Sequence, residues 1–139
     1  MLLKKLVIIG NQEDIKHDFS DFVNNSDYVV RFNRLNSFNK NTGTKTDEIY
    51  FRNNGNNTIW GFDENYNFMF DKDININNIN LTFVNRNYDI NFLNKIDNIT
   101  NKYKLGKINI LYSNYLNIFK KKYGSPSLGK IALENILKS

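Results

Sequence analysis

Three short segments carry residues that could hold a phosphate group. These residues are Gly10 and Asn11 after a first apolar run, Asn33 after a second, and Ser127, Leu128 and Gly129 at the start of an apolar helix pattern. Asparagine side chains offer amide donors and carbonyl acceptors. A helix start presents unpaired N–H groups and the positive end of the helix dipole, and both favour an anion. If the three segments meet, they form a phosphate or nucleotide pocket.

Each of these residues also has a purely structural use. A glycine after a strand commonly marks a turn, and an asparagine there commonly forms an Asx-turn or a cap. The same serine that could face a phosphate could simply cap the last helix. The shared location favours the binding site, because ligands of parallel sheets bind beyond the carboxyl ends of the strands.

Few other side chains could act in catalysis, metal binding or phosphate binding. His17 is the only side chain that ordinarily titrates near neutral pH, and we expect it to face solvent. Asp71 and Asp73 match an Asp-x-Asp metal pattern, although a solvated loop is the favoured interpretation. Lys45 and Lys122 could steer a phosphate, with solvated lysines as the alternative. The chain has no Cys and one His, which excludes thiolate and multi-histidine metal sites, so we expect no metal.

Hydrophobic patterning predicts the elements that position these residues. Strands are expected over 3–9, 27–32, 47–51, 81–84 and 107–112, and helices over 13–23, 90–99 and 127–137, with a further helix within 114–122. Residues 53–80 are expected to form a loop or a small helical insertion, whose aromatic residues cover one edge of the core or stack on a sugar or base. Alternating strands and helices predict an α/β, Rossmann-like fold with a mostly parallel sheet and helices on both faces.

The length and the net charge of the chain limit the functions and partners that it could have. A length of 139 residues indicates one nucleotide-sugar-binding α/β domain over 1–139. The net charge of +5 favours nucleotides, acidic glycans, nucleic acid or an anionic membrane surface as partners. The absence of a recognition-helix or RNP-type motif argues against nucleic acid. No apolar stretch has the length of a signal peptide or a membrane span, so we expect a cytoplasmic protein, peripheral to the inner membrane at most.

Two patches of the chain resemble the sialylmotifs of the animal-type sialyltransferase family. The order of Val7-Ile8-Ile9-Gly10-Asn11, then the run from Asn25 to Asn33, then Thr42-Gly43-Thr44-Lys45-Thr46-Asp47 resembles the large sialylmotif. Ser125-Pro126-Ser127-Leu128-Gly129 and the helix after it resemble the small sialylmotif. A weaker likeness exists to bacterial lipooligosaccharide sialyltransferases, which share the strand-Gly-Asn opening.

The resemblance implies a glycosyltransferase that moves sialic acid from CMP-sialic acid to a cell-surface glycan, such as lipooligosaccharide or capsule, without metal or other cofactor. It implies that Asn11 and Asn33 contact the CMP moiety. It also implies that Ser127, the Leu128 backbone and Gly129 surround the phosphate. A nucleotide-sugar donor and a glycan acceptor are therefore the expected partners.

Three departures from the family pattern open an alternative. The family's catalytic His lies beyond the small motif, past the position of Ser139, so the resemblance assigns no catalytic residue here. Gln12 replaces a small residue, and Glu13 and Asp14 place negative charge where a phosphate would approach. The cysteines of secreted members are absent, which suits a reducing cytoplasm. The alternative is a truncated or non-catalytic nucleotide- or glycan-binding remnant, with a homodimer covering its open sheet edge.

Overall fold

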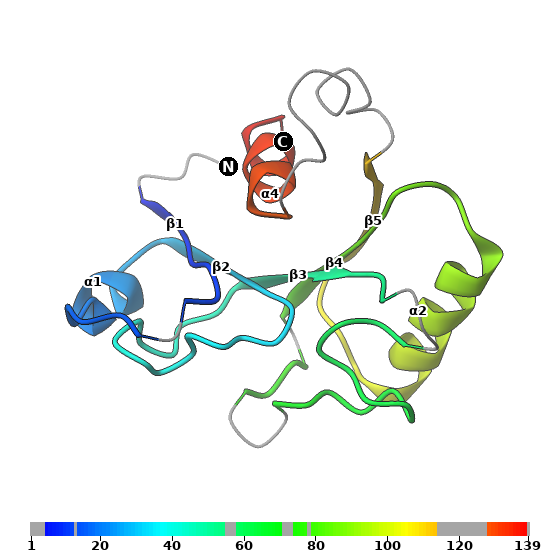
Figure 1. The fold of residues 1–139 in the computed structure, drawn as a ribbon, viewed down its shortest axis with the longest axis horizontal. Coiled ribbons are helices and arrows are strands. Elements are labelled where there is room, and N and C mark those ends of the chain that lie inside the picture. Colours follow the sequence, from blue (N-terminus) through cyan, green and yellow to red (C-terminus); the bar gives the residue numbers. More distant parts are fainter. Residues whose placement is uncertain are drawn as a thin grey trace.

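A five-stranded parallel sheet forms the centre of the protein (Figure 1). The computed structural model describes residues 5–12, 14–54, 58–70, 74–77, 79–113 and 128–138. Its strands lie in the order β1 (Leu6–Ile8), β2 (Tyr28–Phe32), β3 (Glu48–Arg52), β4 (Asn80–Asn85) and β5 (Ile108–Tyr112). Helix α4 (Leu128–Lys138) covers one face, and α1 (Ser20–Asn24) and α2 (Ile90–Lys102) lie on the other. The predicted α/β, Rossmann-like fold with helices on both faces is confirmed.

The face under α4 combines an apolar centre with a polar row at the amino ends of the strands. Ile131 and Ala132 of α4 are fully buried against Val30 and Val84. At the amino ends, the buried Glu48 carboxylate accepts hydrogen bonds from the Tyr28 hydroxyl at 2.9 Å and the Thr82 hydroxyl at 2.6 Å. Burial raises the pKa of the Tyr28 hydroxyl. Every polar group of this row therefore has a partner, as burial requires.

The opposite face packs against α2 and the long connection between β3 and β4. Phe51 and Phe83 of the sheet are stacked with ring centroids 5.8 Å apart, and Phe62 and Phe68 from the connection cover them. In the described part of this connection the chain forms two isolated antiparallel bridges, Asn53–Ile59 and Phe62–Phe68, and no helix. The expectation that these aromatic residues cover the core is confirmed.

The predicted helix over residues 13–23 is wrong for most of its length. Residues 14–19 are not helical, and only α1 forms, from Ser20. The Asn41 amide nitrogen donates to Ile15 O at 2.7 Å, and Phe19 N donates to Asn41 O at 2.8 Å. These two bonds to the β2–β3 connection replace bonds that a helix would form within itself. A distant asparagine therefore overrides the helical spacing of the apolar residues.

The β2–β3 connection is held under the sheet by a buried arginine. Arg31 is the fourth of the five residues of β2 and is 1% exposed. Its guanidinium donates to Thr42 O at 2.9 Å, Gly43 O at 3.0 Å and the Thr46 hydroxyl at 2.9 Å, with further bonds to the Thr42 hydroxyl and Lys45 O. Burial lowers the pKa of Arg31 to about 10, which leaves the side chain a cation at neutral pH.

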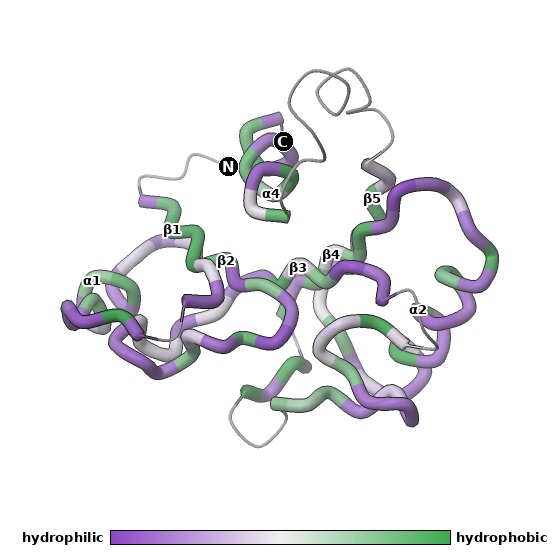
Figure 2. Tube along the Cα trace, in the orientation of Figure 1, coloured by the Kyte–Doolittle hydropathy of each residue, from purple (hydrophilic) through white to green (hydrophobic). Residues whose placement is uncertain are grey.

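Hydrophobic residues concentrate along strands such as β1 and β5, whereas the turns between elements are mostly hydrophilic (Figure 2). Within the described residues, no helix combines the length and the apolar character that crossing a bilayer demands.

Replacing Gly61 by alanine should destabilise the fold. Gly61 has φ +97°, and a Cβ there would lie 2.6 Å from Phe51 Cε1 and 2.7 Å from Asn33 O. We expect Gly61→Ala to lower the free energy of unfolding by about 2–4 kcal/mol in urea titration, from backbone strain and overpacking. Gly10→Ala is the matched control, because its Cβ would meet nothing within 4 Å and should change stability by less than about 0.5 kcal/mol. Equal stabilities of the two variants would contradict this account.

Candidate functional site

Hydrogen bonds join the segment after β1 to the segment after β2. The Ser37 hydroxyl donates to Gly10 O at 2.6 Å, and Asn36 N donates to Asn11 Oδ1 at 3.2 Å. The strands are parallel and in register, with Ile8 opposite Val30. The structure therefore brings Gly10 and Asn11 to the turn that follows Asn33, at the carboxyl edge of the sheet.

Asn33 ties the end of β2 to the end of β3. Its backbone lies in the left-handed region at φ 47°, which asparagine tolerates better than most residues. Its N–H donates to Tyr50 O at 3.0 Å, and its Oδ1 accepts from Arg52 N at 3.0 Å. Asn33 therefore has a structural role, but as a link between two strands rather than as an Asx-turn, and this bond fixes the orientation of its side chain.

The same bonds leave amide donors at the edge. Asn11 and Asn33 each use Oδ1 to accept a backbone N–H, while neither Nδ2 donates to any residue in the part of the chain that the structure describes. Both residues are partly exposed. Two amide NH₂ groups thus remain available to a ligand rich in acceptors, such as a phosphate or a pyrimidine base.

Gly10 leaves open space beside these amides. Its φ is not positive, so it does not supply the left-handed turn that glycine uniquely allows. A Cβ at this position would meet nothing within 4 Å, and the residue is exposed. What glycine provides here is room for a ligand to approach the backbone closely.

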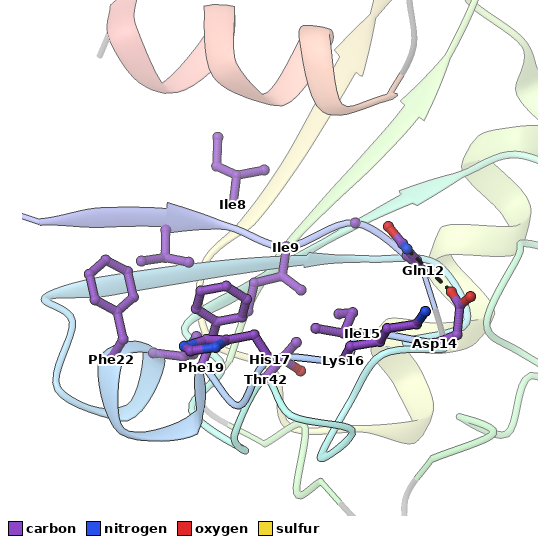
Figure 3. A pocket seen from close by; sticks show the side chains of 13 residues that line it. Ile8, Ile9, Gln12, Asp14, Ile15, Lys16, His17, Phe19, Phe22 and Thr42 are labelled. Atoms are coloured by element: carbon purple, nitrogen blue, oxygen red, sulfur yellow. Dashed lines mark hydrogen bonds between the residues drawn. The ribbon is translucent and has the colours of Figure 1, made fainter.

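The start of α4 packs on the face of the sheet that carries the Ile8 side chain. Leu128 packs against the cluster of Val30, Phe32 and Val84. Figure 3 shows α4 on the side of the sheet toward which the Ile8 side chain points. Ser127 and Lys122 lie outside the described residues, as do Asp71 and Asp73 and the expected helix within 114–122.

The structure places Lys45 at the opposite edge. Its Nζ donates to the carbonyl of Ser26 and, at 3.4 Å, to that of Asp27, and it lies 3.9 Å from the Asp47 carboxylate. These groups flank the amino end of β2. Lys45 is thus not brought to the carboxyl edge that holds Gly10, Asn11 and Asn33, and its contacts clamp the β2–β3 connection.

An open pocket of about 720 Å³ extends from Gly10 along the other side of β1 (Figure 3). Its wall is apolar, with Val7 and Ile9 of the sheet facing Phe19 and Phe22, which are 45% and 53% exposed. Of the polar side chains that line the pocket, Gln12 and Asp14 lie at the end that β1 runs toward, whereas His17 lies beside Phe19. Such a volume matches that of small-molecule sites. Because Gly10 lines the pocket, the pocket reaches the carboxyl edge of the sheet.

His17 lies on this pocket and faces solvent, as expected, although not on a helix. Its ring packs against that of Phe19 with centroids 4.6 Å apart. Among the described residues, no group of three or more His, Cys, Asp or Glu side chains is placed to hold a metal ion.

Arg31 is a residue for which the sequence pattern predicted no role. It lies within the resembling run but received no role. A charged residue inside the apolar run Tyr28–Phe32 was the available signal, because a cation there must bring buried acceptors with it. No protein-family model, curated protein sequence or solved structure matches the chain.

Replacing Arg31 should destabilise the protein far more than replacing an exposed arginine. Arg31→Met removes the guanidinium donor from Thr42 O and Lys45 O, whereas Gly43 O keeps its bond from Asn39 N. We expect a loss of about 2–4 kcal/mol in the free energy of unfolding, measured by urea titration. Arg86→Met is the control, since Arg86 is exposed, and it should change stability by less than about 0.5 kcal/mol. A neutral Arg31→Met would show that the guanidinium does not hold the connection.

Proposed function

We propose that the carboxyl edge of the sheet binds the CMP part of CMP-sialic acid, and that the chain is the nucleotide-binding domain of a sialyltransferase-like glycosyltransferase. The observation that carries this proposal is the junction of Gly10, Asn11 and the Asn33 turn, with two amide donors left over. Leu128, the first residue of α4, packs against the cluster that includes Phe32 at the end of β2, and this position supports the proposal. The resemblance to the two sialylmotifs supplies the identity of the nucleotide.

The donor groups of this edge suit a nucleoside monophosphate. A phosphate oxygen accepts hydrogen bonds only, and cytosine presents its O2 and N3 as acceptors. The Nδ2 groups of Asn11 and Asn33 would donate to such atoms. The first N–H groups of α4, an eleven-residue helix, would face an anion with the favourable end of the helix dipole.

The transfer itself needs leaving-group stabilisation and a base. As the bond between the sugar and the phosphate oxygen breaks, the sugar passes through an oxocarbenium-like state and the phosphate gains charge. Hydrogen-bond donors at the edge would stabilise that charge. The attacking acceptor hydroxyl loses its proton to a general base, and the family places a His beyond the small motif for this purpose. His17 does not match that position, so the alternative of a non-catalytic nucleotide- or glycan-binding remnant is kept.

The nucleotide preference is testable by thermal unfolding. We expect CMP to raise the midpoint of unfolding, and UMP, AMP and GMP at the same concentration to raise it less, because a ligand of the folded state stabilises it by mass action. An equal response to the four nucleotides, or none, would contradict the proposal.

Changing the two asparagines to aspartate tests their donor role without removing their structural bonds. Asn33→Asp and Asn11→Asp keep an oxygen for Arg52 N and Asn36 N but replace the NH₂ donor by an acceptor. We expect near-normal stability and at least a tenfold weaker affinity for CMP, since a charged ligand group loses a donor. Asn101→Asp, an exposed change near the end of α2, is the matched control. Unchanged CMP affinity in both edge variants would refute the assignment.

Release of CMP from CMP-sialic acid separates the two candidate functions. An enzyme should release CMP faster than the buffer does, by transfer or by slow hydrolysis, and Asn33→Asp should abolish the excess. Binding of CMP without release, unchanged by His17→Ala, would favour the remnant. Both results are read by chromatography of the nucleotide.

A further inference from the structure

A row of arginines lies along the carboxyl edge, beyond the proposed nucleotide site. Arg34 comes two residues after β2, Arg52 is the last residue of β3, and Arg86 directly follows β4. These three strands are consecutive neighbours in the sheet. Adjacent strands lie about 4.8 Å apart, so the row spans roughly 10 Å. It extends from Asn33 away from β1, whereas Gly10 and Asn11 lie on the β1 side.

The charges of Arg34 and Arg86, at the two ends of this row, are not neutralised within the described part of the chain. Arg34 and Arg86 are exposed, and neither forms an ion pair with a described carboxylate. Asp89, the nearest acid along the chain to Arg86, instead caps α2 by accepting from Asn91 N at 2.9 Å. Arg52 is partly buried, and this burial lowers the pKa of its guanidinium. The edge therefore has an excess of positive charge.

An aromatic ring lies within the row. The Arg34 guanidinium sits 4.3 Å from the centroid of the Trp60 ring, and Trp60 N donates to Arg52 O at 3.2 Å. The neighbouring Gly61 packs against Asn33 O, which holds this segment at the end of β2. Trp60 is partly exposed. An indole face packs against the apolar face of a sugar ring, and a stacked guanidinium is oriented to grip a carboxylate with two hydrogen bonds.

We propose that Arg34, Arg86 and Trp60 form an acceptor site for an acidic glycan, one that already bears a carboxylate. This inference rests on the proposed function, since it names the class of acceptor for the same edge. A sugar ring would pack on Trp60 while its carboxylate pairs with Arg34 or Arg86. The acceptor then lies beside the CMP-bound donor, on the side of β3 and β4.

The test compares a carboxylated and a neutral oligosaccharide on the whole chain. Calorimetric titration should give at least tenfold tighter binding of 3′-sialyllactose than of lactose, in the presence of saturating CMP. The double variant Arg34→Gln/Arg86→Gln should lose this preference while its thermal response to CMP stays normal. The control is Lys104→Gln/Lys107→Gln, which removes the same charge from exposed residues at the opposite edge and should keep the preference.

Four outcomes would overturn the inference. They are equal binding of the two sugars by the native chain, the same loss of preference in the lysine control, displacement of 3′-sialyllactose by an equal concentration of inorganic phosphate, and a loss of CMP response in the arginine variant. The last would show that the arginines serve the donor. Failure of the proposed function looks different, because CMP would then give no selective stabilisation to the native chain, which is measured first and without any glycan.

Discussion

The buried guanidinium of Arg31 is the constraint on which the carboxyl edge depends. A cation inside a sheet face is tolerated only when acceptors surround it, and here the acceptors come from residues 42–46. The β2–β3 connection must therefore fold back under β2. Its first residues then tether Gly10 and Asn11, and its Asn41 holds the segment before α1. One charged side chain thus arranges the loops at the edge of the first two strands.

The two edges of the sheet differ in how completely their polar groups are satisfied. At the amino edge, Tyr28, Glu48 and Thr82 bond to one another, and Lys45 is bound by carbonyl groups and Asp47. At the carboxyl edge, the Oδ1 atoms of Asn11 and Asn33 accept backbone N–H groups, while their Nδ2 groups donate to no residue that the structure describes. Satisfied groups stabilise the fold, whereas exposed donors without partners can bind a ligand at little cost in stability.

The sequence predicted most of the regular elements and part of the candidate site. Runs of β-branched and aromatic residues identified all five strands, and apolar spacing identified α2 and α4, because these signals are local. The same spacing failed over residues 14–19, where bonds to Asn41 hold the chain in another conformation. Gly10, Asn11, Asn33 and Ser127 were expected to meet; the structure ties Gly10 and Asn11 to the turn that follows Asn33, and Ser127 lies outside the described residues. Lys45 was expected either to steer a phosphate or to be a solvated lysine, and its bonds hold it at the other edge.

The sequence by itself determined that this chain forms a parallel α/β sheet with amide side chains following its first two strands. Only the tertiary structure decided that Arg31 gathers the β2–β3 connection, that one oxygen of each edge asparagine is already used, and that Arg34, Arg86 and Trp60 share one edge. The physical reason is that hydrophobic periodicity is a property of neighbouring residues. Hydrogen bonds and charge rows join residues far apart along the chain, and they exist only once strand order and register bring those residues together.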